Sequence, residues 1–157
     1  MIFVTVGTTQ YPFRRLIDWS IQQAKSYPNE KVVIQSGVYK VIQNVSDNIL
    51  IQQSFAFPEV QEYIKKSDQI ICHAGMGTII QCWSFGKKPF VVPRLEKYGE
   101  HANDHETQIC RYLYHQDKIN ILNMNSQLNL GFIKSWNMKV SDSSKKLNLI
   151  KYLALVC

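Results

Sequence analysis

Two short loops rich in glycine and threonine each follow an apolar run, and both have the residue types that bind anions. The first consists of Gly7, Thr8 and Thr9, directly after the apolar run at residues 2–6. Glycine lets the backbone approach a ligand closely, and threonine hydroxyls can donate hydrogen bonds to oxyanions. The sequence therefore predicts that this loop contacts a phosphate group or a similar anion.

The second loop runs from His73 to Thr78 and contains two glycines, Gly75 and Gly77. An apolar run at residues 69–72 precedes it and a helical pattern follows, so the loop opens a predicted helix. Backbone N–H groups at a helix N-terminus, together with the helix dipole, can hold a diphosphate. A tight strand-to-helix turn could have the same composition, because a single Gly-x-Gly motif is a weak signal.

Pro93 and Arg94, after an apolar run, lead into a third polar segment. Residues 99–106 of this segment contain more titratable side chains than the start of a helix requires. One capping residue is enough to begin a helix, and Asn103 or Asp104 would serve. The additional histidines and carboxylates, Glu106 among them, indicate a site. His105 is the best candidate for a general base by residue type, because imidazole titrates near neutral pH.

A zinc site is the main alternative for this segment. His101 and His105 lie four residues apart and Cys110 follows, so these side chains could share a helix face. However, residues 103–104 predict that the helix begins between the two histidines, and no fuller ligand set accompanies them. We therefore predict no metal. The 4 cysteines form no CxxC pair, which favours small buried side chains in a reducing compartment.

Strand and helix patterns alternate along the chain and place the three segments after strands. Apolar runs predict strands at residues 2–6, 31–35, 48–54, 69–72, 90–92 and 119–122. Helical spacing predicts helices at residues 12–26, 58–66, 78–86, 103–115 and 144–156. This alternation predicts an α/β, Rossmann-like parallel sheet with helices on both faces. In such sheets ligands bind at the carboxyl ends of the strands.

Bulk properties fit one soluble domain over residues 1–157. The chain is 45% hydrophobic and 19% charged, which excludes a disordered protein. Its formal net charge of +6 favours anionic partners such as nucleotide phosphates or an acidic membrane surface. The lysines are scattered and form no basic stripe with aromatic residues, so no nucleic-acid partner is expected. We find no signal peptide and no apolar run of about 20 residues, and we expect a cytoplasmic protein.

The ordered set of motifs resembles bacterial exopolysaccharide and capsule glycosyltransferase subunits of the glycosyltransferase family 28 C-terminal-domain type. The matching segments are residues 3–9, 12–17, 73–78, 86–94 and 99–105. They are also similar to the eukaryotic subunit that, with a membrane partner, adds the second N-acetylglucosamine to dolichol-linked oligosaccharide. The resemblance covers roughly residues 1–122 and implies the donor-binding half of a GT-B glycosyltransferase.

The resemblance implies a transferase that uses a UDP-sugar as donor substrate and needs no cofactor. It would transfer a hexose, such as galactose, glucose or N-acetylglucosamine, to a lipid-linked acceptor in polysaccharide biosynthesis. A membrane-anchored partner subunit would supply the acceptor half, and the heterodimer would lie at the inner membrane face. The implied substrate-binding residues are Gly7, Thr8, Thr9, His73, Gly75, Gly77, Thr78, Gln81, Asn103, Asp104 and Glu106, with His105 as the catalytic candidate.

The predicted helix at residues 144–156 has an apolar stripe near helical spacing, with lysines beside it. Two interpretations remain open for this stripe. It can pack on the sheet of its own domain, or it can dock on the partner with the lysines near anionic lipid.

The sequence departs from the family at three positions. Gln81 stands where the family usually has a glutamate that binds ribose hydroxyls, Glu106 stands where it usually has glutamine, and Arg14 replaces a small acidic or amide residue. These departures leave a non-catalytic nucleotide-binding regulatory subunit as an alternative. An NAD-dependent oxidoreductase is a second alternative, but Ile80 stands where its motif needs a third glycine.

Overall fold

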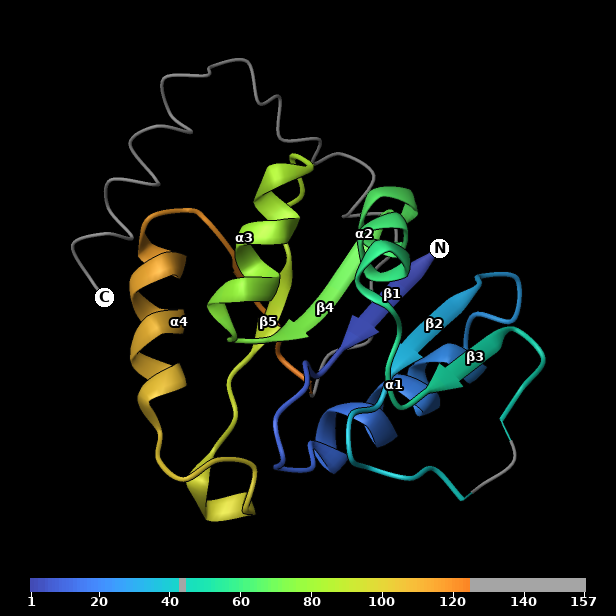
Figure 1. Cartoon of the computed structure of the whole chain (residues 1–157), viewed down its shortest axis with the longest axis horizontal. Coiled ribbons are helices and arrows are strands. Elements are labelled where there is room, and N and C mark those ends of the chain that lie inside the picture. Colours follow the sequence, from blue (N-terminus) through green and yellow to red (C-terminus); the bar gives the residue numbers. More distant parts are fainter. Residues whose placement is uncertain (43–44, 125–157) are drawn as a thin grey trace.

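Six parallel strands form one sheet in the computed structural model, which describes residues 1–42 and 45–124 (Figure 1). The strands lie in the order β3-β2-β1-β4-β5-β6. Their bounds are β1 (Ile2–Thr5), β2 (Val32–Gln35), β3 (Ile49–Gln52), β4 (Gln69–His73), β5 (Phe90–Val92) and β6 (Asn120–Ile121). The sheet therefore confirms the predicted α/β, Rossmann-like class with parallel strands.

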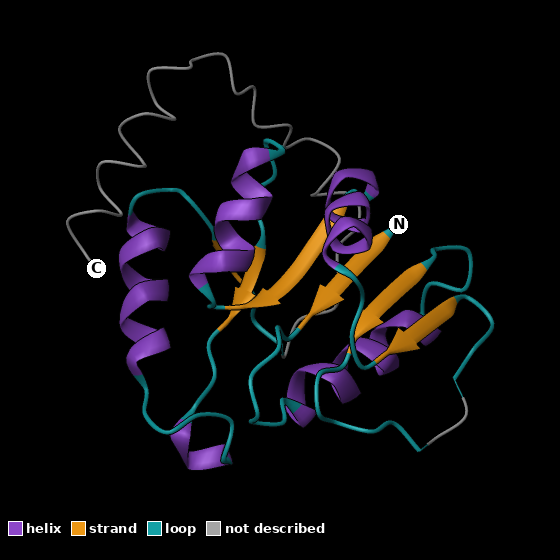
Figure 2. Cartoon of the chain, viewed as in Figure 1, coloured by secondary structure: helices purple, strands orange, loops and turns teal. Residues whose placement is uncertain are grey.

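Helices cover both faces of the sheet (Figure 2). They are α1 (Arg14–Lys25), α2 (Phe57–Lys66), α3 (Met76–Ser84) and α4 (His105–His115), with a 3-10 turn, η1 (Glu96–Tyr98), between β5 and α4. Alternate residues of each strand point to opposite faces. Thus Ile2 and Val4 pack with α1 in one apolar cluster, whereas Phe3 packs with α2 and α3 in another.

The two central strands, β1 and β4, are where the chain changes direction across the sheet. From β1 the chain continues to β2 and β3 on one side, and from β4 it continues to β5 and β6 on the other. Thr5 at the end of β1 is paired with Cys72 near the end of β4. The loops that leave these strands therefore start side by side at the topological switch point, where ligands bind in open α/β sheets.

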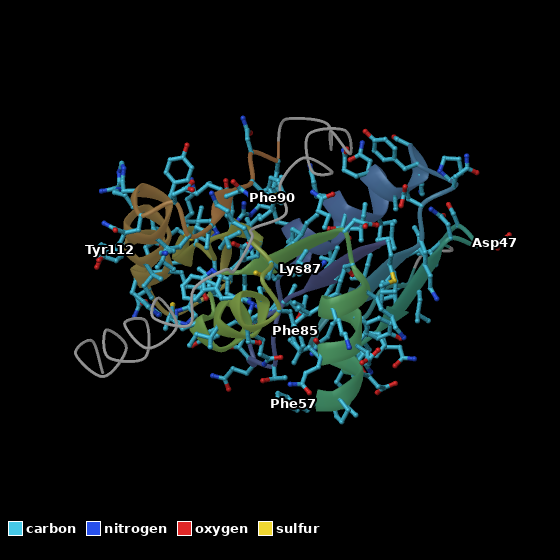
Figure 3. The ribbon with its side chains drawn as sticks, turned by 90° about the horizontal axis from the view of Figure 1, so that it is seen from above. Asp47, Phe57, Phe85, Lys87, Phe90 and Tyr112 are labelled. Carbon is cyan, nitrogen blue, oxygen red and sulfur yellow. The ribbon has the colours of Figure 1, made fainter. Side chains whose placement is uncertain are left out.

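The connection from α3 to β5 lies near the middle of the molecule. Seen from above, Phe85 and Lys87 of this connection lie between Tyr112 on α4 and Asp47 before β3, which mark opposite ends (Figure 3). Lys87 donates a hydrogen bond through Nζ to the carbonyl oxygen of Ser67 at 3.0 Å. This contact ties the start of β5 to the residues that precede β4.

Two helix starts differ in how well the sequence predicts them. Helix α1 begins at Arg14, two residues after the predicted start at Pro12, because Phe13 is fully buried in a non-helical conformation. Helix α4 begins at His105 with Asp104 as its N-cap, which confirms that the helix starts between the two histidines.

The predicted helix at residues 144–156 lies outside the described residues. Within residues 1–42 and 45–124, no helix is long and apolar enough to cross a membrane.

Candidate functional site

The first loop leaves β1 in a conformation that requires glycine. Gly7 has φ of +70°, in the left-handed region that side chains disfavour. Its N–H donates to the hydroxyl of Thr5 at 3.2 Å, and that hydroxyl donates to Oε1 of Gln35 on β2 at 2.9 Å. Thr8 is exposed, and the hydroxyl of Thr9 accepts a hydrogen bond from the N–H of Tyr11 at 3.4 Å. Hydrogen bonds to Thr5 of β1, and through it to Gln35 of β2, thus fix the start of the loop. Thr8 lies exposed at the edge of the sheet.

The second loop delivers the N-terminus of α3 to the same edge. Gly75 is the residue before the helix, and its carbonyl oxygen accepts from the N–H groups of Thr78 and Ile79 at 3.1 and 3.2 Å. Gly77 is exposed, and a Cβ built there meets no heavy atom within 4 Å. Open space beside the first-turn N–H groups of α3 is the arrangement that an anion needs.

The side chain of His73 lies between the two glycine loops. A Cβ at Gly7 would stand 2.6 Å from Cε1 of His73, and a Cβ at Gly75 would stand 2.1 Å from Nε2. Both distances are shorter than any side chain tolerates, so the histidine ring explains why glycine occupies both positions. From the sequence, glycine is expected at both positions because a ligand approaches the backbone closely. The ring of His73 gives a second reason, which lies within the protein itself.

His73 is neutral at physiological pH. Burial lowers the pKa of its imidazole to about 4; the nearby carboxylate of Glu106 opposes this shift, and the Arg94 guanidinium adds to it. Its Nδ1 is buried without a hydrogen bond of normal geometry among the described residues, although the backbone of Thr5 also favours the protonated ring. A neutral imidazole can donate one hydrogen bond to a phosphate but adds no charge to the site.

Residues 102–105 of the third segment are exposed, and the ring of His101 connects this segment to Tyr11, which follows the first loop. The His101 ring lies 5.5 Å from the Tyr11 ring and 4.7 Å from the His105 ring, between centroids. Asn103 Oδ1 accepts from the N–H of His105 at 3.2 Å and also contacts its ring nitrogen Nδ1. Oδ1 of Asp104 accepts from the N–H of Glu96 at 2.7 Å and so caps η1. All three side chains, Asn103, Asp104 and His105, are exposed at the start of α4.

Arg94 ties the first loop to the third segment, a role that sequence reasoning missed. Its side chain is fully buried and donates to the carbonyl oxygens of Val6 at 2.8 Å, Tyr11 at 2.9 Å and Glu100 at 2.9 Å. The guanidinium also lies over the ring of Phe13, 4.6 Å from its centroid. Hydrogen bonds from a charged donor stabilise a fold by about 1.5–3 kcal/mol each. The only signal in the sequence is an arginine at a strand end.

A partly buried ion pair strengthens the same connection. Arg15 donates to both carboxylate oxygens of Glu100, from Nε at 2.9 Å and from a terminal nitrogen at 2.7 Å, and also to the carbonyl oxygen of Pro93 at 3.1 Å. Glu100 is 2% exposed, and its Oε2 also accepts from the N–H of Leu95 at 3.0 Å. This two-point contact fixes helix α1 against the chain that follows β5.

Two of the predicted site residues, Glu106 and Gln81, have buried side-chain oxygens. Glu106 is 5% exposed and accepts hydrogen bonds through Oε2 from the N–H groups of Ala74 and Arg94. Gln81 lies on α3, one turn beyond Thr78, and its Oε1 is buried without a hydrogen-bond partner among the described residues. Oε1 of Gln81 can therefore accept a hydrogen bond that the described residues do not supply.

The geometry brings ten of the predicted residues to one edge of the sheet. They are Gly7, Thr8, Thr9, His73, Gly75, Gly77, Thr78, Asn103, Asp104 and His105. The first-turn N–H groups of α3 can hold an anion, and the polar side chains of residues 103–105 lie exposed at the start of α4. Within residues 1–42 and 45–124, no three His, Cys, Asp or Glu side chains group so that they could hold a metal ion.

Comparison with known proteins assigns this arrangement to a family. The glycosyltransferase family 28 C-terminal domain matches residues 1–151. The chain belongs to this family. No curated protein sequence matches the chain.

Solved structures of glycosyltransferases share the fold. The glycotransferase of kitacinnamycin has a TM-score of 0.61 at 12% identity, and 92% of this chain covers 35% of that protein. The calicheamicin glycosyltransferase CalG4 has a TM-score of 0.52 at 12% identity, with coverages of 92% and 35%. The glycosyltransferase SnogD from Streptomyces nogalater has a TM-score of 0.50 at 14% identity, with coverages of 98% and 42%. The chain thus spans well under half the length of these proteins.

Proposed function

We propose that this family 28 domain binds a UDP-sugar and forms the donor half of a glycosyltransferase. The carrying observation is that two glycine loops meet at the switch point between β1 and β4, that the second of them opens helix α3, and that a Cβ at Gly77 would meet no heavy atom within 4 Å. Nucleotide-sugar donors carry a diphosphate, and a helix N-terminus stabilises that group without a metal. The domain would therefore hold the donor and stabilise the departing UDP.

The residues around this position can be grouped by the part of the donor that each would contact. Thr8, Thr9, His73 and Thr78, together with backbone N–H groups of the glycine loops, would contact the diphosphate or nucleotide. Gln81 would accept a hydrogen bond from the ribose, and Asn103, Asp104 and His105 would face the sugar or the uracil. His105 is the candidate general base of this chain, because it is an exposed imidazole at the start of α4.

The acceptor half is proposed to come from a membrane-anchored partner. The support for this proposal is the resemblance of the motifs to those of two-protein glycosyltransferases, in which a membrane partner accompanies the donor-binding subunit. The reaction would be hexose transfer to a lipid-linked acceptor in exopolysaccharide or capsule biosynthesis. The domain would then lie at the cytoplasmic face of the membrane through its partner.

Calorimetric titration tests the donor assignment directly. We expect the protein to bind UDP and UDP-sugars, not NAD, and to do so equally well after treatment with EDTA. The expectation of metal independence follows from the lack of an Asp-x-Asp pair suited to holding Mg²⁺ against a diphosphate. Binding of NAD without UDP would overturn the assignment, and binding that returns only with Mg²⁺ or Mn²⁺ would overturn its metal-free form.

Substitution of Gln81 tests the ribose contact. Gln81→Ala should weaken UDP binding, whereas Gln81→Glu should preserve or tighten it by on the order of 1 kcal/mol, because a carboxylate accepts hydroxyl hydrogen bonds more strongly than an amide. Affinities for UDP and for pyrophosphate, which lacks ribose, are measured for both variants. An equal loss for the two ligands would place Gln81 away from the ribose.

A non-catalytic nucleotide-binding subunit is the second candidate function. It is favoured by Gln81, which stands where the resembling family has a charged ribose ligand. UDP binding without sugar transfer in the presence of the partner would support this alternative.

A further inference from the structure

Two imidazoles lie at the start of α4, and residue type alone does not decide which of them can accept a proton. The rings of His101 and His105 lie 4.7 Å apart between centroids, and the ring of Tyr11 lies 5.5 Å from that of His101. A neutral imidazole has one nitrogen that donates and one that accepts, so only the unprotonated nitrogen can serve as a base. The tautomer of each ring therefore determines its use.

A backbone N–H group determines the tautomer of His101. The N–H of Asn103 donates to Nδ1 of His101 at 3.4 Å. A backbone N–H group can only donate, so Nδ1 must be the accepting nitrogen of the ring. When the ring is neutral, its proton therefore lies on Nε2. In this arrangement His101 is a hydrogen-bond donor through Nε2 and not a base.

A second backbone N–H group determines the tautomer of His105 through the side chain of Asn103. The N–H of His105 donates to Oδ1 of Asn103 at 3.2 Å, so the oxygen of this amide is the atom that faces the start of the helix. The same oxygen contacts Nδ1 of His105. Since a carbonyl oxygen only accepts, Nδ1 must carry the proton of the neutral ring. The lone pair of His105 then lies on Nε2, the nitrogen that Asn103 does not contact.

We propose that Asn103 is a positioning residue that holds His105 with its Nε2 lone pair free, and that His105 rather than His101 is the base of the transfer reaction. The inference rests on the proposed donor function. In the transfer step, Nε2 of His105 takes the proton of the acceptor hydroxyl. The hydroxyl oxygen bonds to the anomeric carbon of the hexose, the bond from that carbon to the diphosphate breaks, and UDP leaves with the electron pair of that bond.

Nitrogen NMR of the imidazole rings tests the tautomers in the protein without a ligand. At alkaline pH, where both rings are neutral, we expect the proton of His105 on Nδ1 and that of His101 on Nε2. Asn103→Ala should lower the ratio of the Nδ1–H to the Nε2–H form of His105 about fivefold, the effect of one lost hydrogen bond. Asn103→Asp keeps an oxygen acceptor and should retain the wild-type ratio. Gln108→Ala, at an exposed position on α4, is the matched control and should behave as wild type.

Transfer assays in the presence of the partner subunit test the use of His105. We expect kcat to fall about 10²–10⁴-fold in His105→Ala, the usual effect of losing a general base. In Asn103→Ala kcat should fall about fivefold with the tautomer ratio, and Asn103→Asp should restore it. The KM for the UDP-sugar should change less than kcat in each variant. Melting temperatures of the same variants show whether any loss of kcat comes from unfolding.

The outcomes distinguish the positioning role from the donor function. A proton on Nε2 of His105 in the wild-type protein, or an unchanged tautomer ratio in Asn103→Ala, overturns the positioning role. A larger loss of kcat in His101→Ala than in His105→Ala overturns the choice of base. UDP binding without transfer by the wild-type complex rejects the base role and leaves donor binding intact. Failure of the wild-type protein to bind UDP rejects the donor function, and the transfer step with it.

Discussion

Gly75→Val is expected to abolish UDP binding while the rest of the sheet remains folded. A Cβ at Gly75 would stand 2.1 Å from Nε2 of His73, so the ring and the loop before α3 must move apart. Overpacking of this kind costs about 1–3 kcal/mol, and here it falls on the loop that presents the first-turn N–H groups of α3. Calorimetry with UDP measures the loss, and circular dichroism shows whether the helices and sheet persist.

Gly77→Ala is the matched control for this experiment. A Cβ at Gly77 meets no heavy atom within 4 Å, and alanine is the better helix former, so stability should be equal or slightly higher. A bulkier Gly77→Val should weaken UDP binding, because the added side chain occupies the space proposed for the diphosphate. Full UDP affinity in folded Gly75→Val and Gly77→Val proteins would mean that the loop is only a turn.

Purified alone, the chain is expected to transfer no sugar, and activity should appear only when the partner subunit is added. The donor loops are proposed to bind the UDP-sugar, and the resemblance to two-protein glycosyltransferases implies that a partner supplies the acceptor half. The difference should be all or none in an assay that follows transfer of radiolabelled sugar from the UDP-sugar into lipid extracts. UDP binding by the single chain is the internal control.

Robust transfer by the single chain to a lipid acceptor would refute the two-protein proposal. Truncation after Asp142 then asks whether the predicted helix at residues 144–156 is the docking element. A shortened protein that binds UDP but no longer co-purifies with the partner supports docking. A shortened protein that unfolds indicates that the segment belongs to the domain core.

Local patterns predict the elements well because the inner strands β1, β2 and β4 are mostly apolar and buried along nearly their whole length. The run at residues 2–6 became β1, and residues 69–72 became most of β4, since parallel strands covered on both faces leave little polar alternation. The start of α4 at His105 also followed from the polar residues before it. The two glycine loops lie at the carboxyl edge of the sheet, as the order of the apolar runs predicts.

The interactions that hold the site together could not be predicted in the same way. Arg94 bonds to residues 83 and 88 positions away, and Arg15 bonds to Glu100 across 85 positions. No local pattern encodes such contacts, because an arginine at a strand end looks the same whether it faces solvent or the interior. Burial of Glu106 was equally hidden, since its exposed neighbours Asp104 and His105 suggested a polar surface.

These long-range contacts determine when the site can form as the protein folds. The central strand β1 comes first in the chain, but its partner β4 and the anchor Arg94 are synthesised much later. Closing loops of this length costs conformational entropy before any contact stabilises them. The half of the sheet made by β1, β2 and β3 can associate early, whereas the first glycine loop acquires its final shape only after β5 and α4 have emerged from the ribosome. A nascent chain released before Glu106 would carry both glycine motifs and still lack an ordered donor site.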